Sequence, residues 1–294
     1  MDYVLHIVVL MSIYSILAVS LDLQVGQMGL VSISQAAFYG IGAYALALTA
    51  INTRSFLLGL LVATAVSGVS SLVISMPSGR LRGDYLFIGT FAFQLIVSAL
   101  LNNLQWLTGG PLGISGIPAP AIGRFAVHTR GGFAIMAVLM AVLMAVATIV
   151  VVRQIMVSAM GRDMRVIRDD EILAKALGKN TSLIKATMVA ISAGLAGLAG
   201  AIYASYTTYI DPSSFTFGES LLILSMVIIG GAGRLCGPIL GAAILVLMPE
   251  VLRVIGFPSS TAASLRQIAY GALLVILMFV RPSGILGRHS FRRR

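Results

Sequence analysis

Long apolar stretches recur from one end of this 294-residue chain to the other. A helix needs about 20 mostly apolar residues to cross the hydrocarbon core of a bilayer, and most of these stretches approach that length. Apolar residues make up 58% of the chain, charged residues make up 10%, and the mean hydropathy is +0.99. No soluble domain has an interior large enough for that composition. The sequence therefore predicts an all-α fold, a polytopic transmembrane helix bundle.

Polar residues divide the apolar sequence into about nine expected spans. These lie near residues 3–22, 28–51, 56–76, 85–103, 132–152, 185–206, 219–232, 236–252 and 266–280. The first has the length of a secretory signal, but it follows Asp2 instead of a basic start, and no small-residue cleavage site stands out behind it. No segment between the spans is long and polar enough for a soluble domain, so we expect residues 1–294 to form a single membrane domain.

Basic residues predict the orientation of the spans, because short loops rich in Arg and Lys stay on the cytoplasmic side. The loop at about 153–185 is the richest, with Arg153, Arg162, Arg165, Arg168, Lys175, Lys179 and Lys185. An even number of spans separates this loop from Arg80 and Arg82, and also from the arginines that end the chain at 281–294. All three clusters are therefore expected in the cytoplasm. The amino terminus and the Gly- and Pro-rich segment 104–131 are expected outside, with a minority of external arginines at Arg54, Arg124, Arg130, Arg253 and Arg266.

The charged and metal-ligating residues exclude two classes of function. A net charge of +10 is typical of a positive-inside protein beside anionic membrane lipid, and basic clusters without interleaved aromatic residues argue against nucleic acid as a partner. The three histidines are His6, His128 and His289, which lie in separate segments, and Cys236 is the single cysteine. We therefore expect no metal site, no intrachain disulfide and no cofactor.

Polar side chains at the start of the second expected span are the candidates for a substrate path. They are Gln27, Ser32, Ser34, Gln35 and Tyr39. Polar groups are costly in lipid, so they are expected to face protein, water or a translocation path. Hydrogen bonding between helices explains them equally well. Small residues at helical spacing in 190–201 predict close helix packing instead of a site.

The cytoplasmic loop contains a second candidate site at residues 169–178. This segment predicts a short amphipathic helix with Asp169, Asp170 and Glu171 at its start and Gly178 at its end. Acidic residues favour a helix start, and glycine favours a helix end. A solvated helix that merely links two spans would show the same pattern.

Six motifs spread over nearly the whole chain resemble the LivM-type permeases of ABC importers for branched-chain amino acids. They occupy residues 29–44, 108–118, 167–178, 180–203, 230–241 and 281–287. Their combined order makes the resemblance specific. It departs from the family at Gln35, where a histidine is common, and this puts a substrate role at that position in question.

The resemblance implies a single membrane permease domain in the bacterial inner membrane that works by alternating access and is not an enzyme. It also implies a LivH-like second permease subunit, two cytoplasmic ATPase subunits, and a periplasmic or lipid-anchored substrate-binding protein. The helix in the 153–185 loop would be the coupling helix that docks into an ATPase. The expected ATPase-coupling residues are Asp169, Asp170, Glu171, Ala174, Lys175 and Gly178. The chain has no G-x-x-x-x-G-K-[ST] phosphate-binding loop, so ATP would act through a partner.

Three alternatives remain open at this point. One is a related permease for urea, short amides or sugars. Another is an ion-coupled secondary transporter, which normally needs buried ionisable residues. The carboxylates here fall at predicted span edges, as Asp2, Asp22, Asp84, Asp211, Glu219 and Glu250 show, so this alternative is disfavoured. The third is a membrane scaffold that transports nothing.

Overall fold

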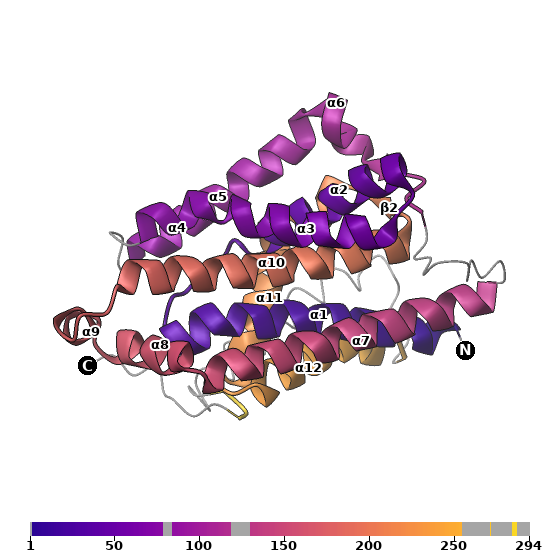
Figure 1. The fold of residues 1–294 in the computed structure, drawn as a ribbon. Helices are drawn as coiled ribbons and strands as arrows, with labels where there is room; N and C mark the ends of the chain where they lie inside the picture. Colours follow the sequence, from indigo (N-terminus) through magenta and orange to yellow (C-terminus); the bar gives the residue numbers. More distant parts are fainter. Residues whose placement is uncertain (1, 79–83, 119–129, 255–270, 272–283, 287–294) are drawn as a thin grey trace.

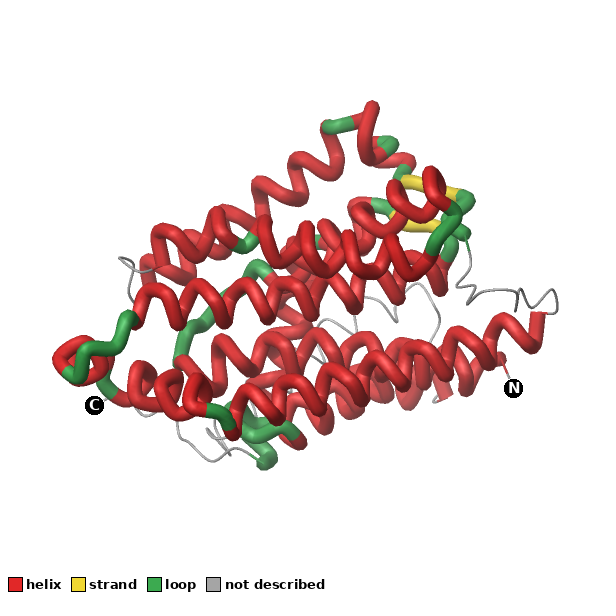
Figure 2. Tube along the Cα trace, viewed as in Figure 1, coloured by secondary structure: helices red, strands yellow, loops and turns green. Residues whose placement is uncertain are grey.

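The computed structural model describes residues 2–78, 84–118, 130–254, 271 and 284–286, and nearly all of their regular structure is helical (Figure 2). The helices are α1 (Asp2–Met28), α2 (Gln35–Thr53), α3 (Phe56–Ser70), α4 (Leu72–Ser78), α5 (Asp84–Asn103), α6 (Gln105–Thr108), α7 (Arg130–Val157), α8 (Ala159–Asp169), α9 (Glu171–Ala176), α10 (Thr181–Thr207), α11 (Phe217–Gly230) and α12 (Cys236–Val254). Two short 3-10 helices lie at Gly110–Leu112 and Pro212–Phe215. Strand β1 (Ile114–Ser115) pairs antiparallel with β2 (Tyr209–Ile210), with Ile114 opposite Ile210.

Six helical segments are long and apolar enough to cross a membrane, so the chain is a multi-pass membrane protein. They are Tyr3–Met28, Gln35–Thr53, Phe56–Ser75, Tyr85–Asn103, Ile135–Val157 and Thr181–Thr207. The spans expected at 219–232 and 236–252 correspond to α11 and α12, which are apolar but contribute only the shorter apolar segments Phe217–Gly230 and Cys236–Met248. The span expected at 266–280 lies outside the described residues, as do Arg80, Arg82 and the terminal arginines. The count of about nine spans stays a prediction.

The junction between the first two spans differs from the sequence prediction. We expected a boundary near residues 22–28, but α1 continues to Met28 and α2 begins only at Gln35, with no helix at 29–34. Gly29 adopts a left-handed backbone with φ +69°, and the N–H of Leu30 turns back to the Gln24 carbonyl at 2.9 Å. Glycine ends helices in this way because it has no Cβ to oppose a positive φ.

Helix α10 lies at the centre of the fold, with α2 and α3 on one side and α1 on the other (Figure 1). Helix α1 also packs against α7 and α12, and α11 crosses steeply behind α1 and α10. The small residues expected to pack closely do so, because a Cβ added to Gly42 of α2 would overlap the backbone of Gly197 in α10. The absence of side chains at both positions lets the two helix backbones approach each other.

The two ends of the bundle carry different structures. Helices α8 and α9 lie at one end, and α9 extends beyond the long helices (Figure 1). The amino-terminal end of α1 and the β1–β2 pair lie at the opposite end (Figure 2). This arrangement places the basic 153–185 loop and the start of α1 at opposite ends, as the expected orientation requires.

Candidate functional site

The helix expected at residues 169–177 corresponds to α9, which begins at Glu171, and a sharp break at Asp170 separates it from the preceding helix α8. Asp169 is the last residue of α8, and Asp170 has an extended backbone at φ −156° and ψ 108°. Its carboxylate oxygen accepts hydrogen bonds from the N–H groups of Ile172 at 2.8 Å and Leu173 at 3.1 Å. Asp170 is therefore the N-cap of α9, and Gly178 follows that helix with φ +77°. The capping residues are those that the sequence indicates, but the separate helix α8 was not expected.

Helix α9 presents apolar side chains to its surroundings. Ile172 is 67% exposed, Leu173 52% and Leu177 64%, whereas Ala174 is fully buried against the protein. We refer to Ile172, Leu173 and Leu177 as the α9 apolar face. Exposed apolar groups on a segment outside the spans are typical of a surface that contacts another molecule.

Glu171 fixes α9 to the N-terminal part of α10. One carboxylate oxygen accepts from the Lys185 ammonium at 2.8 Å, and the other lies 3.1 Å from the Lys175 ammonium. Burial of Glu171 would raise its pKa, but hydrogen bonds from Lys185 and Lys175 outweigh that effect and lower the pKa to about 2. A second ion pair, at 3.1 Å between Lys179 and Asp163, joins the end of this loop to α8. The loop is therefore held from two sides while its apolar face remains open.

The five candidates for the substrate path are all buried in the protein, but they do not meet in one site. The Ser32 and Ser34 hydroxyls lie 3.0 Å apart in the segment between α1 and α2. Gln35 donates to the Ser20 hydroxyl of α1 at 2.7 Å, and its amide oxygen has no partner among the described residues. Gln27 donates to the Gly233 carbonyl at 3.1 Å. Tyr39 is 3% exposed and packs its ring against Tyr203 and Phe215.

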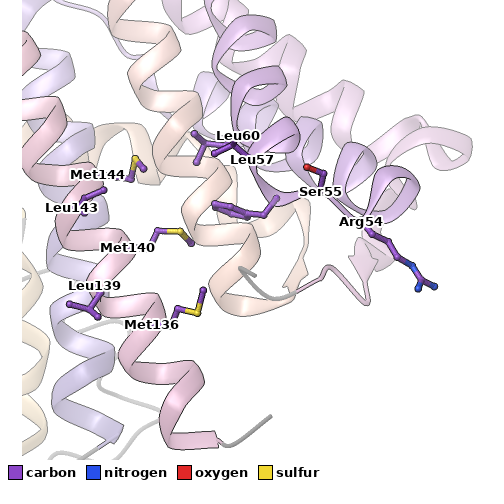
Figure 3. A pocket seen from close by; sticks show the side chains of 10 residues that line it. Arg54, Ser55, Leu57, Leu60, Met136, Leu139, Met140, Leu143 and Met144 are labelled. Atoms are coloured by element: carbon purple, nitrogen blue, oxygen red, sulfur yellow. The ribbon is translucent and has the colours of Figure 1, made fainter. Parts of the chain in front are cut away.

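A groove of about 600 Å³ lies between α3 and α7, away from these candidates (Figure 3). Its apolar lining consists of Phe56, Leu57, Leu60, Met136, Leu139, Met140, Leu143 and Met144. Arg54 and Ser55 lie at one side, and the Arg54 side chain points away from the methionines (Figure 3). This lining offers few partners for the two charged groups of an amino acid, so we do not assign the groove as a substrate site.

Comparison with known proteins identifies the family. Residues 3–278 match the family described as "Branched-chain amino acid transport system / permease component". The chain belongs to this family. It is 36% identical to the high-affinity branched-chain amino acid transport system permease protein LivM of Salmonella typhimurium, over 93% of this chain and 68% of that protein. It is 35% identical to LivM of Escherichia coli, over 95% and 69% of the two chains. Its identity to Escherichia coli LivH is 25%, over 96% and 93%. No solved structure matches the chain significantly.

The start of α2 in this permease depends on polar residues that sequence reasoning missed. Its first N–H groups are not capped by Ser34. Instead, Ala37 donates to the Gln94 amide oxygen at 2.7 Å, and Ala36 donates to the Ser220 hydroxyl at 2.9 Å. Gln94 also donates to the Phe215 carbonyl at 3.0 Å. The available signal was an amide in the middle of the apolar 85–103 stretch, away from its polar end, since such a group must find partners in the protein.

Asp22 corrects one expectation about the permease. We placed this carboxylate at a span edge, but α1 extends six residues beyond it and Asp22 is 2% exposed. It accepts a hydrogen bond at 2.8 Å from the N–H of Gly233, in the turn between α11 and α12. The argument against an ion-coupled transporter therefore does not extend to Asp22. Among the residues that the structure describes, no three His, Cys, Asp or Glu side chains are arranged to hold a metal ion.

Proposed function

We propose that this chain is the membrane-spanning permease subunit of an ATP-binding-cassette importer in the bacterial inner membrane, and that it carries branched-chain or other hydrophobic amino acids. Membership of the permease family and the six long apolar helices support this function. The relatives include both LivM and LivH permease proteins of branched-chain amino acid transport systems, and that supports pairing with a LivH-like second permease. A substrate-binding protein outside the membrane would deliver the amino acid.

The observation that carries the ATP-dependent part of the proposal is the α9 apolar face. Two large apolar side chains, Ile172 and Leu173, are exposed on this six-residue helix, and a third, Leu177, is exposed at its C-cap. The basic residues predict that this end of the bundle is cytoplasmic. Ion pairs of Glu171 with Lys175 and with Lys185 of α10 fix the position of this helix. A rigid apolar projection of this kind suits insertion into a groove on another protein. We assign that protein as one of two ATPase subunits.

Transport in this proposal proceeds by alternating access without covalent chemistry in the chain. Closure of the ATPase pair on ATP moves α9, and the bundle reorients around a path between its helices. The non-helical segment 29–34 and the start of α2 are the region where backbone groups and polar side chains, including Ser32, Ser34 and Gln35, would line that path. Irregular backbone within a membrane domain is tolerated where it is buried in protein or lines such a path.

A co-purification experiment tests the assignment. The permease, a LivH-like partner and the two ATPases are expressed together, with Ile172→Asp and Leu173→Asp combined in the permease. We expect normal permease abundance and loss of the ATPases, because two carboxylates would then have to be buried at the interface. The matched control is Leu112→Asp, since Leu112 is 83% exposed near β1 at the other end of the bundle. Retention of the ATPases by the double variant would contradict the docking role of α9.

A further inference from the structure

Arg168 of α8 is bonded to the end of α1, 142 residues away in the sequence. Its guanidinium Nη1 donates to the Gly26 carbonyl at 2.7 Å, and its side chain is only 17% exposed. Gly26 lies in the last turn of α1, where carbonyl groups have no partner within the helix. A charged donor therefore satisfies the helix end that immediately precedes the non-helical segment 29–34.

The side chain of Arg168 and the turn at Gly233 both pack closely against glycines of α1 and of the segment that follows it. A Cβ added to Gly29 would lie 2.9 Å from the Arg168 Cγ, and Gly29 already has a positive φ. A Cβ on Gly26 would overlap the Asp22 carboxylate and the backbone of Gly233. Glycine is required at both positions so that the arginine and the neighbouring turn can approach α1.

The turn between α11 and α12 joins the same contact. The N–H of Gly233 is bonded to Asp22 at 2.8 Å, and its carbonyl is bonded to Gln27 at 3.1 Å. Both polar groups of this residue are therefore held by α1. We define Asp22, Gly26, Gln27, Gly29, Arg168 and Gly233 as the inner junction. It connects α8, the break between α1 and α2, and the turn between α11 and α12.

The inner junction lies directly beside the proposed coupling helix. Arg168 is separated by one residue from Asp170, the N-cap of α9. The Glu171–Lys185 pair fixes α9 to α10, and the Lys179–Asp163 pair fixes the loop after α9 to α8. A displacement of α9 is therefore expected to displace α8 as well. We propose that Arg168 is the positioning residue that transmits movement of α9 to the break between α1 and α2. This inference rests on the function proposed above.

The test compares transport with ATP hydrolysis in vesicles that contain the full importer. With Arg168→Gln we expect normal abundance and normal ATPase association, continued ATP hydrolysis, and a fall of about ten-fold or more in substrate taken up per ATP, because a hydrogen bond from a charged donor is lost. Arg168→Lys keeps a cationic donor and should recover part of that ratio. The matched control is Arg165→Gln, because Arg165 of α8 donates to the Met156 carbonyl in the last turn of α7 at 3.0 Å and has no hydrogen bond to α1 among the described residues.

Three results would overturn the inference. An unchanged ratio in Arg168→Gln would show that the bond transmits nothing. A parallel fall of abundance, hydrolysis and uptake would show that Arg168 only caps α1. Loss of the ATPase subunits from the Arg168→Gln variant would show that Arg168 is needed for ATPase docking instead of for transmission of movement. Failure of the unmodified chain to bind ATPases would instead reject the proposed function itself, so the two failures are distinguishable.

Discussion

The Lys185 ammonium lies 2.8 Å from the Glu171 carboxylate, although only 3% of the Lys185 side chain is exposed. This ion pair joins the N-terminal part of α10, a helix long and apolar enough to span a membrane, to the first residue of α9. A buried cation without its partner is strongly unfavourable, so the position of α9 is linked to the folding of the span that follows it.

Replacement of Glu171 should therefore affect the loop more than replacement of its exposed partner. Glu171→Gln leaves Lys185 buried without an anion, and we expect a cost of about 3 kcal/mol. Lys175 is 44% exposed, so Lys175→Gln should cost less than about 1 kcal/mol. Hydrogen exchange of the amides at 171–177 measures both effects. Equal protection in the two variants would contradict the structural role of the buried pair.

Acid should loosen this loop only at low pH. The folded-state pKa of Glu171 is about 2, below the ordinary value of 4.5, so the carboxylate stabilises the loop fully above pH 4.5 and loses that effect as the pH falls toward 2. A tryptophan at Leu177, with the single natural Trp106 replaced by Phe, reports the change by fluorescence. Glu171→Gln should lack this transition. A transition already near pH 6 in the unmodified loop would show that another group controls it.

The effect of a substitution at Gly178 should depend on how readily the new residue adopts a positive φ, and not on the size of its side chain. The φ of Gly178 is +77°, and, apart from its two chain neighbours, no heavy atom of the described residues lies within 4 Å of the place where a Cβ would stand, so bulk is not the obstacle. Gly178→Val should cost roughly 1–2 kcal/mol at this left-handed position, whereas Gly178→Asn should cost less. We expect normal abundance of both, with weaker ATPase association or uncoupled hydrolysis for the valine variant only. Normal transport by Gly178→Val would show that the loop only links two spans and does not couple ATP hydrolysis to transport.

Gln94 should contribute to the stability of the bundle. Gln94→Leu removes the acceptor of the Ala37 N–H in a fully buried position, and an unsatisfied buried donor costs about 1–3 kcal/mol. Thermal unfolding of the purified permease in detergent measures the loss. The control is Asn103→Leu, because Asn103 is exposed and its side chain donates to the Ala99 carbonyl of its own helix. Similar melting temperatures for the two variants would argue against the role of Gln94.

Cysteine labelling in cells tests the orientation. Cys236 is free and exposed, so it is first replaced by serine. A cysteine at Ile172 should then resist an impermeant thiol reagent applied from outside, whereas one at Leu112, two residues before strand β1, should react. Cysteines at Arg80 and Arg294 are also expected to resist. Rapid labelling at Ile172 would reverse the orientation and reject the cytoplasmic position of α9.

Residue types that act over short sequence distances predicted much of the candidate site, but they did not predict where its helices begin and end. Acidic residues followed by glycine indicated the capping of α9, because a cap acts within three or four residues of itself. The cost of polar groups in lipid likewise indicated that Gln27 and Gln35 are buried. The division of the loop into α8 and α9 was missed, because Asp170 is compatible with both a helix and a helix start until its carboxylate accepts from Ile172 and Leu173.

The sequence by itself determined that this chain is a membrane helix bundle. Its long apolar stretches are stable only in lipid or packed against one another, and in lipid a helix satisfies their backbone hydrogen bonds. Only the tertiary structure decided which polar groups meet. Arg168 bonds to Gly26, Glu171 to Lys185, and Gln94 to Ala37, over separations of 142, 14 and 57 residues. No local pattern selects such partners among the acceptors and donors that a fold brings together. Those pairings depend on how α1, α5, α8 and α10 pack, since a buried polar group takes the nearest partner that the packing provides.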